Sequence, residues 1–143
     1  MGGFSREVGR YVDAVAGARG GKRQAQRLVK LLGVCAAMPE VGSAVWGGHL
    51  MIQVRERTFA YYLNNHHGDG RVALCAKSVA VRQRELVEED PSRYYSPAYL
   101  GVSGWVGVRL DLRAVDWDEV RDVVRGAWLL QAPRKLAASF ADT

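Results

Sequence analysis

Several features that would assign a function class are missing from this sequence. No apolar run comes close to the roughly 18 residues that a membrane-spanning helix needs, and Met1–Gly9 lacks the apolar stretch of a secretory signal. We therefore expect a cytoplasmic protein with no membrane partner. The only two cysteines, Cys35 and Cys75, lie in apolar contexts without metal-ligand spacing. Reduced thiols in the core are the expected state of both.

The motifs of common catalytic and metal sites are also missing. No Gly-x-Ser-x-Gly elbow is present, and the glycine-rich segment 17–22 follows a predicted helix and lacks the spacing of a phosphate-binding loop. His66, His67 and Asp69 offer three metal-binding groups, but adjacent side chains of an extended chain point to opposite sides and structural zinc needs four protein ligands. We therefore predict a protein that is not an enzyme, with no metal site and no cofactor.

The chain of 143 residues is long enough for one domain with its own core, and its 48% hydrophobic and 24% charged residues are typical of globular proteins. Residues 1–30 contain seven basic and two acidic side chains, and the rest of the chain contains thirteen of each. The whole net charge of +5 therefore lies in the N-terminal segment. Such a segment is typical of an arm that binds anions, and equally of a solvated helix face.

Helical periodicity dominates the first forty residues. Apolar residues predict an amphipathic helix over 4–16, and glycines in 17–21 end it. A second helix runs from residue 22 towards Pro39, with Arg23, Arg27 and Lys30 opposite its apolar stripe. We interpret 17–21 as a hinge, so that residues 1–21 form a separate element and residues 22–143 fold without it.

From Val45 the period changes to two, which predicts an antiparallel meander. Its strands are expected at 50–54, 58–63 and 71–77, with a tight turn at 55–57 and a longer polar loop at 64–70. A helix over 79–89 and an irregular segment over 92–103 follow. In a strand over 104–110, Val106, Val108 and Leu110 face the core, whereas Trp105 and Arg109 share the other face.

Asp116 with Glu119 resembles a capping box that opens a C-terminal helix, which Pro133 interrupts before a last short helix over 134–140. Helices at both ends with strands between them predict an α+β fold, in which helices cover one face of an antiparallel sheet.

A series of short motifs in unbroken order over residues 25–140 resembles the MmcQ/YjbR family. The motifs are Leu31-Leu32-Gly33 to Met38-Pro39, Trp46-Gly47-Gly48-His49, Phe59-Ala60, Leu74-Cys75-Ala76-Lys77, Tyr99-Leu100-Gly101, Gly104-Trp105-Val106, and Ala127-Trp128-Leu129-Leu130 before Pro133-Arg134-Lys135-Leu136. The resemblance implies a CyaY-like α/β sandwich for residues 22–143 and a DNA-binding role through a "double wing" of hairpins. The first 20 residues depart from the family pattern, as does Ala127-Trp128, where a serine-tyrosine pair is frequent.

Two functions follow from this resemblance and from the residues. The first is DNA binding with low sequence specificity, through basic side chains that contact phosphates: Arg55, Arg57, Arg71, Lys77, Arg109, Arg23 and Arg27. The alternative is a module that binds a small molecule or a protein in a groove between sheet and helices, near Trp46, His49, Tyr99 and Trp105. A continuous positive surface over the hairpins favours the first, and an apolar pocket with few polar groups favours the second.

Overall fold

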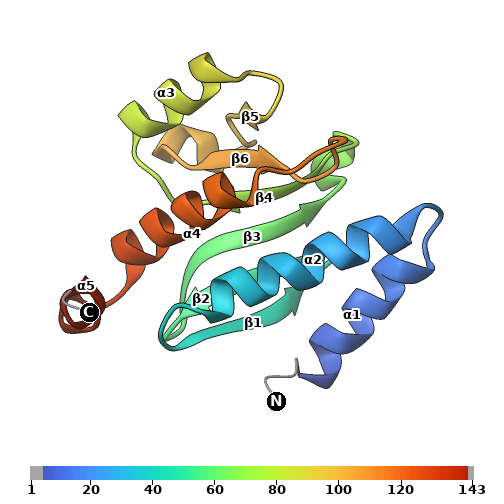
Figure 1. Cartoon of the computed structure of the whole chain (residues 1–143), viewed down its shortest axis with the longest axis horizontal. Helices are drawn as coiled ribbons and strands as arrows, with labels where there is room; N and C mark the ends of the chain where they lie inside the picture. Colours follow the sequence, from blue (N-terminus) through green and yellow to red (C-terminus); the bar gives the residue numbers. More distant parts are fainter. Residues whose placement is uncertain (1–4, 142–143) are drawn as a thin grey trace.

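A computed structural model describes residues 5–141 of the chain (Figure 1). The first half contains helices α1 (Arg6–Gly17) and α2 (Gly21–Ala36), then strands β1 (Val41–Trp46), β2 (His49–Val54), β3 (Arg57–Asn64) and β4 (Val72–Ala76). The second half contains α3 (Ala80–Glu89), β5 (Tyr94–Tyr95), β6 (Val106–Arg109), α4 (Trp117–Gln131) and α5 (Arg134–Ala141). Two short 3-10 turns, η1 (His66–Gly68) and η2 (Leu100–Ser103), lie in loops.

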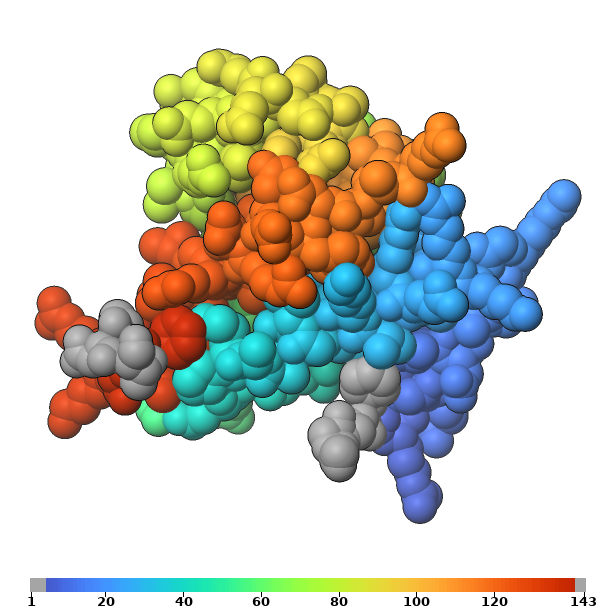
Figure 2. Space-filling model, in the orientation of Figure 1, coloured from blue at the N-terminus to red at the C-terminus, as the bar shows by residue number. Residues whose placement is uncertain are grey.

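The strands form one antiparallel sheet in the order β1-β2-β3-β4-β6-β5. Helices α1, α2 and α4 lie on the same face of it (Figures 1 and 2). The predicted α+β fold is thus confirmed. Strand β1 was not predicted, because Gly42, Ser43 and Ala44 have low strand propensity. It forms through six paired positions with β2, next to the two-residue turn Gly47-Gly48.

The two faces of the sheet differ in what covers them. Val106, Val108 and Leu110 are buried in the main core under the helices, as the alternation predicts. Trp105 lies on the other face with Leu63 and Cys75, in a smaller cluster. Both cysteines are buried free thiols, and burial raises the pKa of each to about 12. Among the described helices, none is long and apolar enough to cross a membrane.

Helix α1 shares the main core, which differs from the expectation that residues 1–21 are a separable element. Val8 is fully buried and belongs to the same cluster as the sheet residues. The Tyr11 hydroxyl donates a hydrogen bond of 2.8 Å to the Gly48 carbonyl oxygen, across to the β1–β2 turn. Gly21 is buried so close to Val15 that a Cβ atom would meet the carbonyl oxygen of that residue at 1.8 Å. The glycine segment is therefore a tight corner between packed helices, and not a hinge.

Candidate functional site

The basic residues predicted to bind DNA divide between the two ends of the sheet. Arg55 and Arg57 lie at the β2–β3 turn, and Lys77 lies beside them, since its N–H donates to the Phe59 carbonyl oxygen. Arg71 and Arg109 lie at the opposite end, where β4 begins and β6 ends. The antiparallel register thus separates the two groups by the length of the strands.

The basic side chains at the hairpin end have partners within the protein. Arg55 makes two hydrogen bonds of 2.7 and 2.8 Å to the carboxylate of Glu40, and these bonds lower the pKa of that carboxyl below its usual value. Lys77 donates to the side-chain oxygen of Gln131 at 3.1 Å, and Arg57 reaches the Gln131 carbonyl at 3.4 Å. These contacts attach the hairpin end to the end of α4.

The side chains at the other end of the sheet have partners as well. The Arg71 guanidinium lies over the ring of Tyr95, at 4.2 Å from its centroid. Arg109 makes two hydrogen bonds of 3.0 Å to Asp111. Burial opposes ionisation of Asp111, but these bonds and the charge of Arg109 outweigh it and hold the pKa of the carboxyl below its usual value.

Arg23 and Arg27 lie opposite the apolar stripe of α2, as predicted, with Arg23 exposed and Arg27 half-buried, and both have hydrogen-bond partners within the protein. Arg27 donates to the carbonyl oxygens of Leu110, Leu112 and Arg113 at 2.6, 2.5 and 3.0 Å. Arg23 donates to the last two of these oxygens. Both arginines therefore fix the segment after β6 against α2, because they satisfy carbonyl groups that no strand partner takes up.

The four residues predicted for the alternative site form one aromatic cluster. Trp46 from β1 lies 5.3 Å from the ring centroid of Tyr61 and 6.0 Å from that of His49. Tyr61 in turn lies 5.8 Å from Trp105. The ring of His66 in η1 lies 5.1 Å from that of His49 and 4.0 Å from that of His67. The ring of His67 lies 5.0 Å from that of Tyr99.

This aromatic cluster borders a pocket of about 280 Å³. The residues that line it are Trp46, Tyr61, Leu63, His66, His67, Ala98, Tyr99 and Leu100. The pocket lies on the sheet face opposite the main core, between η1 and the segment before η2. The predicted location between sheet and helices is therefore wrong, although the predicted residues are brought together.

Two residues that line this aromatic pocket have a left-handed backbone, while other residues of this kind lie at the hairpin end of the sheet. Tyr99 has φ 66° and ψ −56°, and the N–H of Leu100 donates to the Ala98 carbonyl at 2.7 Å, which defines a γ-turn of the rare, strained type. His67 is left-handed, with φ 54°. Residues other than glycine adopt such backbone conformations at a cost of about 1–3 kcal/mol each, and these strained residues cluster at active sites and ligand-binding sites. The turn holds the Tyr99 ring out at the pocket rim, where it is 77% exposed.

Two imidazoles of the aromatic cluster, those of His49 and His66, have lowered pKa values. The N–H of Asn64 donates to Nδ1 of His49 at 3.1 Å, which places the proton of the neutral ring on Nε2. Burial and the neighbouring imidazoles lower the pKa of His49, and Asp69 partly offsets this. Burial and His67 lower the pKa of His66 in the same way. The lowered pKa values favour the neutral imidazole at both His49 and His66.

Six of the lining residues were not predicted as part of the site: Tyr61, Leu63, His66, His67, Ala98 and Leu100. The alternation in β3 places Tyr61 and Leu63 on one face, so the sequence contained a signal for them. Nothing in the sequence showed that the loop 64–70 folds back over this face. Within residues 5–141, no three histidine, cysteine, aspartate or glutamate side chains are grouped so that they could hold a metal ion.

The fold and the aromatic pocket define a small α+β protein with a six-stranded antiparallel sheet and a concave aromatic site on one face. The sequence model of the YjbR family matches residues 36–130, and the chain belongs to this family. The fold is similar to the crystal structure of Deinococcus radiodurans protein DR2400, which contains a DUF419 domain. The TM-score is 0.60 at 24% identity, over 72% of this chain and 76% of that one. No curated protein matches this sequence.

Proposed function

We propose that this protein is a binding module for a small, flat, uncharged molecule held in the aromatic pocket, and that it acts without catalysis. The observation that carries the proposal is the pocket of about 280 Å³, whose lining is aromatic and aliphatic with two imidazoles at the rim. Ligand sites of proteins are usually concave and apolar with a few orienting polar groups, and this pocket is near the lower end of their size range. A ring system of one or two cycles fits such a volume.

The chemistry of the lining supports this class of ligand. Trp46 and Tyr61 offer their rings from the sheet, and Tyr99 offers its ring from the opposite wall. Flat aromatic ligands bind more tightly when they stack with an offset, or edge to face, against such rings. No carboxylate, lysine or arginine lines the pocket, so a charged ligand would find no counter-charge there. Cys75 lies behind it, but burial raises its thiol pKa to about 12, which leaves no thiolate for catalysis.

A titration with indole, followed by protein NMR, tests the proposal. We expect indole to bind with a dissociation constant of about 1 mM, which corresponds to about −4.1 kcal/mol, and to shift the signals of Trp46 and Tyr61. The variants Trp46→Ala and Tyr99→Ala should bind at least tenfold more weakly. Val102→Ala is the matched control, since Val102 is exposed in η2 and does not line the pocket. Equal binding by all of these proteins, or shifts elsewhere in the spectrum, would sink the idea.

Tyr99→Gly separates binding from stability. Both Tyr99→Gly and Tyr99→Ala remove the ring, but only glycine adopts φ 66° without strain. After the extra flexibility of the unfolded glycine chain is subtracted, we expect Tyr99→Gly to be about 1 kcal/mol more stable than Tyr99→Ala. Urea unfolding measures this difference. Because both variants lack the ring, we expect them to bind indole equally weakly although their stabilities differ.

DNA binding remains a second candidate, supported by the net charge of +5 and its position in residues 1–30. Arg6, Arg10, Arg19 and Lys22 are exposed on and after α1. Contacts of this kind need only cations near phosphates, and they bind without sequence preference. The hairpin arginines support this candidate less, because Arg55 already forms an ion pair with Glu40.

A further inference from the structure

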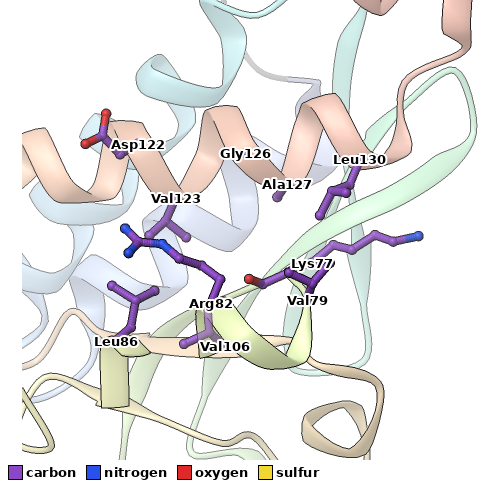
Figure 3. Close-up of a pocket in the computed structure, with 11 residues that line it drawn as sticks. Lys77, Val79, Arg82, Leu86, Val106, Asp122, Val123, Gly126, Ala127 and Leu130 are labelled. Atoms are coloured by element: carbon purple, nitrogen blue, oxygen red, sulfur yellow. The ribbon is translucent and has the colours of Figure 1, made fainter. Parts of the chain in front are cut away.

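A second cavity, of about 240 Å³, lies between α3 and α4 on the helical side of the molecule (Figure 3). It is separate from the aromatic pocket and shares no lining residue with it. Leu86 and Val106 form a buried floor, and Val123, Ala127 and Leu130 of α4 form one wall. The apolar part of this cavity is thus aliphatic, with branched side chains on several sides.

Two opposite charges stand at the α3–α4 cavity without a partner. Arg82 of α3 and Asp122 of α4 both line it, and neither makes an ion pair or hydrogen bond with any residue in the part of the chain that the structure describes. Figure 3 shows the Arg82 guanidinium and the Asp122 carboxylate at one end and the Lys77 ammonium at the other. Lys77 already donates to Gln131. Arg82 and Asp122 are both exposed to solvent, so they place one positive and one negative charge at the mouth of an apolar cavity, where a ligand can reach both.

Gly126 leaves the α4 wall of this cavity open. It lies in the interior of α4, where glycine is unfavourable relative to alanine. A Cβ atom built on Gly126 would meet nothing within 4 Å, so no close packing requires glycine there. The missing side chain instead leaves space in the cavity that it lines.

We propose that the α3–α4 cavity binds a free α-amino acid with a branched aliphatic side chain. The carboxylate of such a ligand pairs with the Arg82 guanidinium in a charge-assisted hydrogen bond, and its ammonium pairs with Asp122. Its side chain packs on Leu86 and Val106, which removes apolar surface from water. A ligand with only one of the two charges makes only one of these two ion pairs. A ligand without the side chain leaves Leu86 and Val106 uncovered. This inference does not depend on the function proposed for the aromatic pocket.

Calorimetric titration of the full chain with leucine and three truncated analogues tests this ligand class. Isocaproate lacks the amine, isoamylamine lacks the carboxylate and glycine lacks the side chain. We expect leucine to bind at least tenfold more tightly than each of the three, since each loses one of the three contacts. Tighter or equal binding of isocaproate would assign the cavity to simple carboxylic acids and overturn the zwitterion assignment. Absence of leucine binding up to its solubility limit would overturn the site itself.

Variants locate the binding on the cavity. Gly126→Leu fills it while replacing a poor helix former with a good one, so the protein stays folded and leucine binding is lost. Gly9→Leu is the matched control, because Gly9 lies in α1 with equally open space and outside the cavity. Arg82→Gln should weaken leucine at least tenfold and isoamylamine hardly at all. Arg84→Gln removes the same charge from α3 outside the cavity and should change neither. Equal effects of the cavity variants and their controls would contradict the proposal.

Discussion

At the scale of single residues, the histidines beside the aromatic pocket couple the fold to pH. His66 has a pKa below its ordinary value of 6.5 because of burial and then of His67, with Asp69 acting in the opposite direction. The unfolded chain therefore takes up a proton at His66 at a higher pH than the folded protein does. By linkage, the stability that the neutral imidazole contributes is complete above about pH 6.5 and is lost as the pH falls through the lowered folded value.

The variant His66→Gln tests this coupling. We expect its free energy of unfolding to fall less than that of the wild type between about pH 7.5 and about pH 5. Urea unfolding at several pH values measures both curves. Because the charge of His66 also lowers the pKa of His49, the contribution of His49 shrinks in the variant as well, which changes the difference in the same direction. If the two curves run parallel over this range, His66 titrates equally in the folded and unfolded chains and the predicted coupling is absent.

At the scale of elements, α1 is the part whose role changes most between sequence and structure. The helix was predicted, and its side chain at Val8 is fully buried against the core of the sheet. We expect Val8→Ala to lower the free energy of unfolding by about 2 kcal/mol, since it removes buried methyl groups and leaves a cavity. Arg10→Ala, at an exposed position of the same helix, should change it by less than about 0.5 kcal/mol. Deletion of residues 1–21 should destabilise the domain more than either variant.

Chemical denaturation of the three proteins checks this order. A deletion variant that unfolds with the same midpoint and the same slope as the full chain would restore the original prediction of a separable N-terminal element. The slope matters because it follows the surface that unfolding exposes. A smaller slope with a lower midpoint would show that α1 contributes buried surface, as the contact of Tyr11 with the β1–β2 turn implies.

The sequence predicted the elements with strong periodicity, and it failed where tertiary contacts decide. Helix α4 and its N-cap were predicted, and Asp116 indeed accepts hydrogen bonds from the N–H groups of Asp118 and Glu119. In α2 the apolar periodicity predicted a buried stripe of Ala25, Leu28, Val29, Leu32, Cys35 and Ala36. Four of these are buried, but Val29 and Ala36 are exposed, and Leu31, which was not included, is buried. Strand β1 has little strand propensity of its own, and its pairing with β2 and its contacts with α1 and α2 hold it in place.

The candidate site shows the same division. Trp46, His49, Tyr99 and Trp105 were singled out by the family resemblance and by chemistry, and they do form one cluster. The alternation in β6 correctly placed Trp105 on the face away from the main core, but the groove was predicted between sheet and helices, and the pocket lies on the face that the helices leave open. The contribution of His66 and His67 depends on how their loop folds, which no local pattern encodes.

At the scale of the whole molecule, the distribution of charge determines which residues would attract nucleic acid. The hairpin arginines have partners, and the excess charge lies in residues 1–30. Any binding to duplex DNA should therefore follow total charge and not the hairpin. The logarithm of the binding constant should fall with the logarithm of salt concentration by about 0.9 for each phosphate contacted.

Paired charge removals decide between a hairpin interface and this general attraction. We expect the double variant Arg55→Ala with Arg57→Ala to lose as much affinity as Arg121→Ala with Arg125→Ala, because each removes two positive charges. The pairs are well matched, since Arg55 is bridged to Glu40 and Arg121 to Asp118. Fluorescence anisotropy with a labelled duplex at several salt concentrations measures both losses and both slopes. A clearly larger loss for the hairpin pair, with a slope reduced by about two phosphate contacts, would instead establish the hairpin as a DNA interface and place the double-wing role ahead of the aromatic pocket.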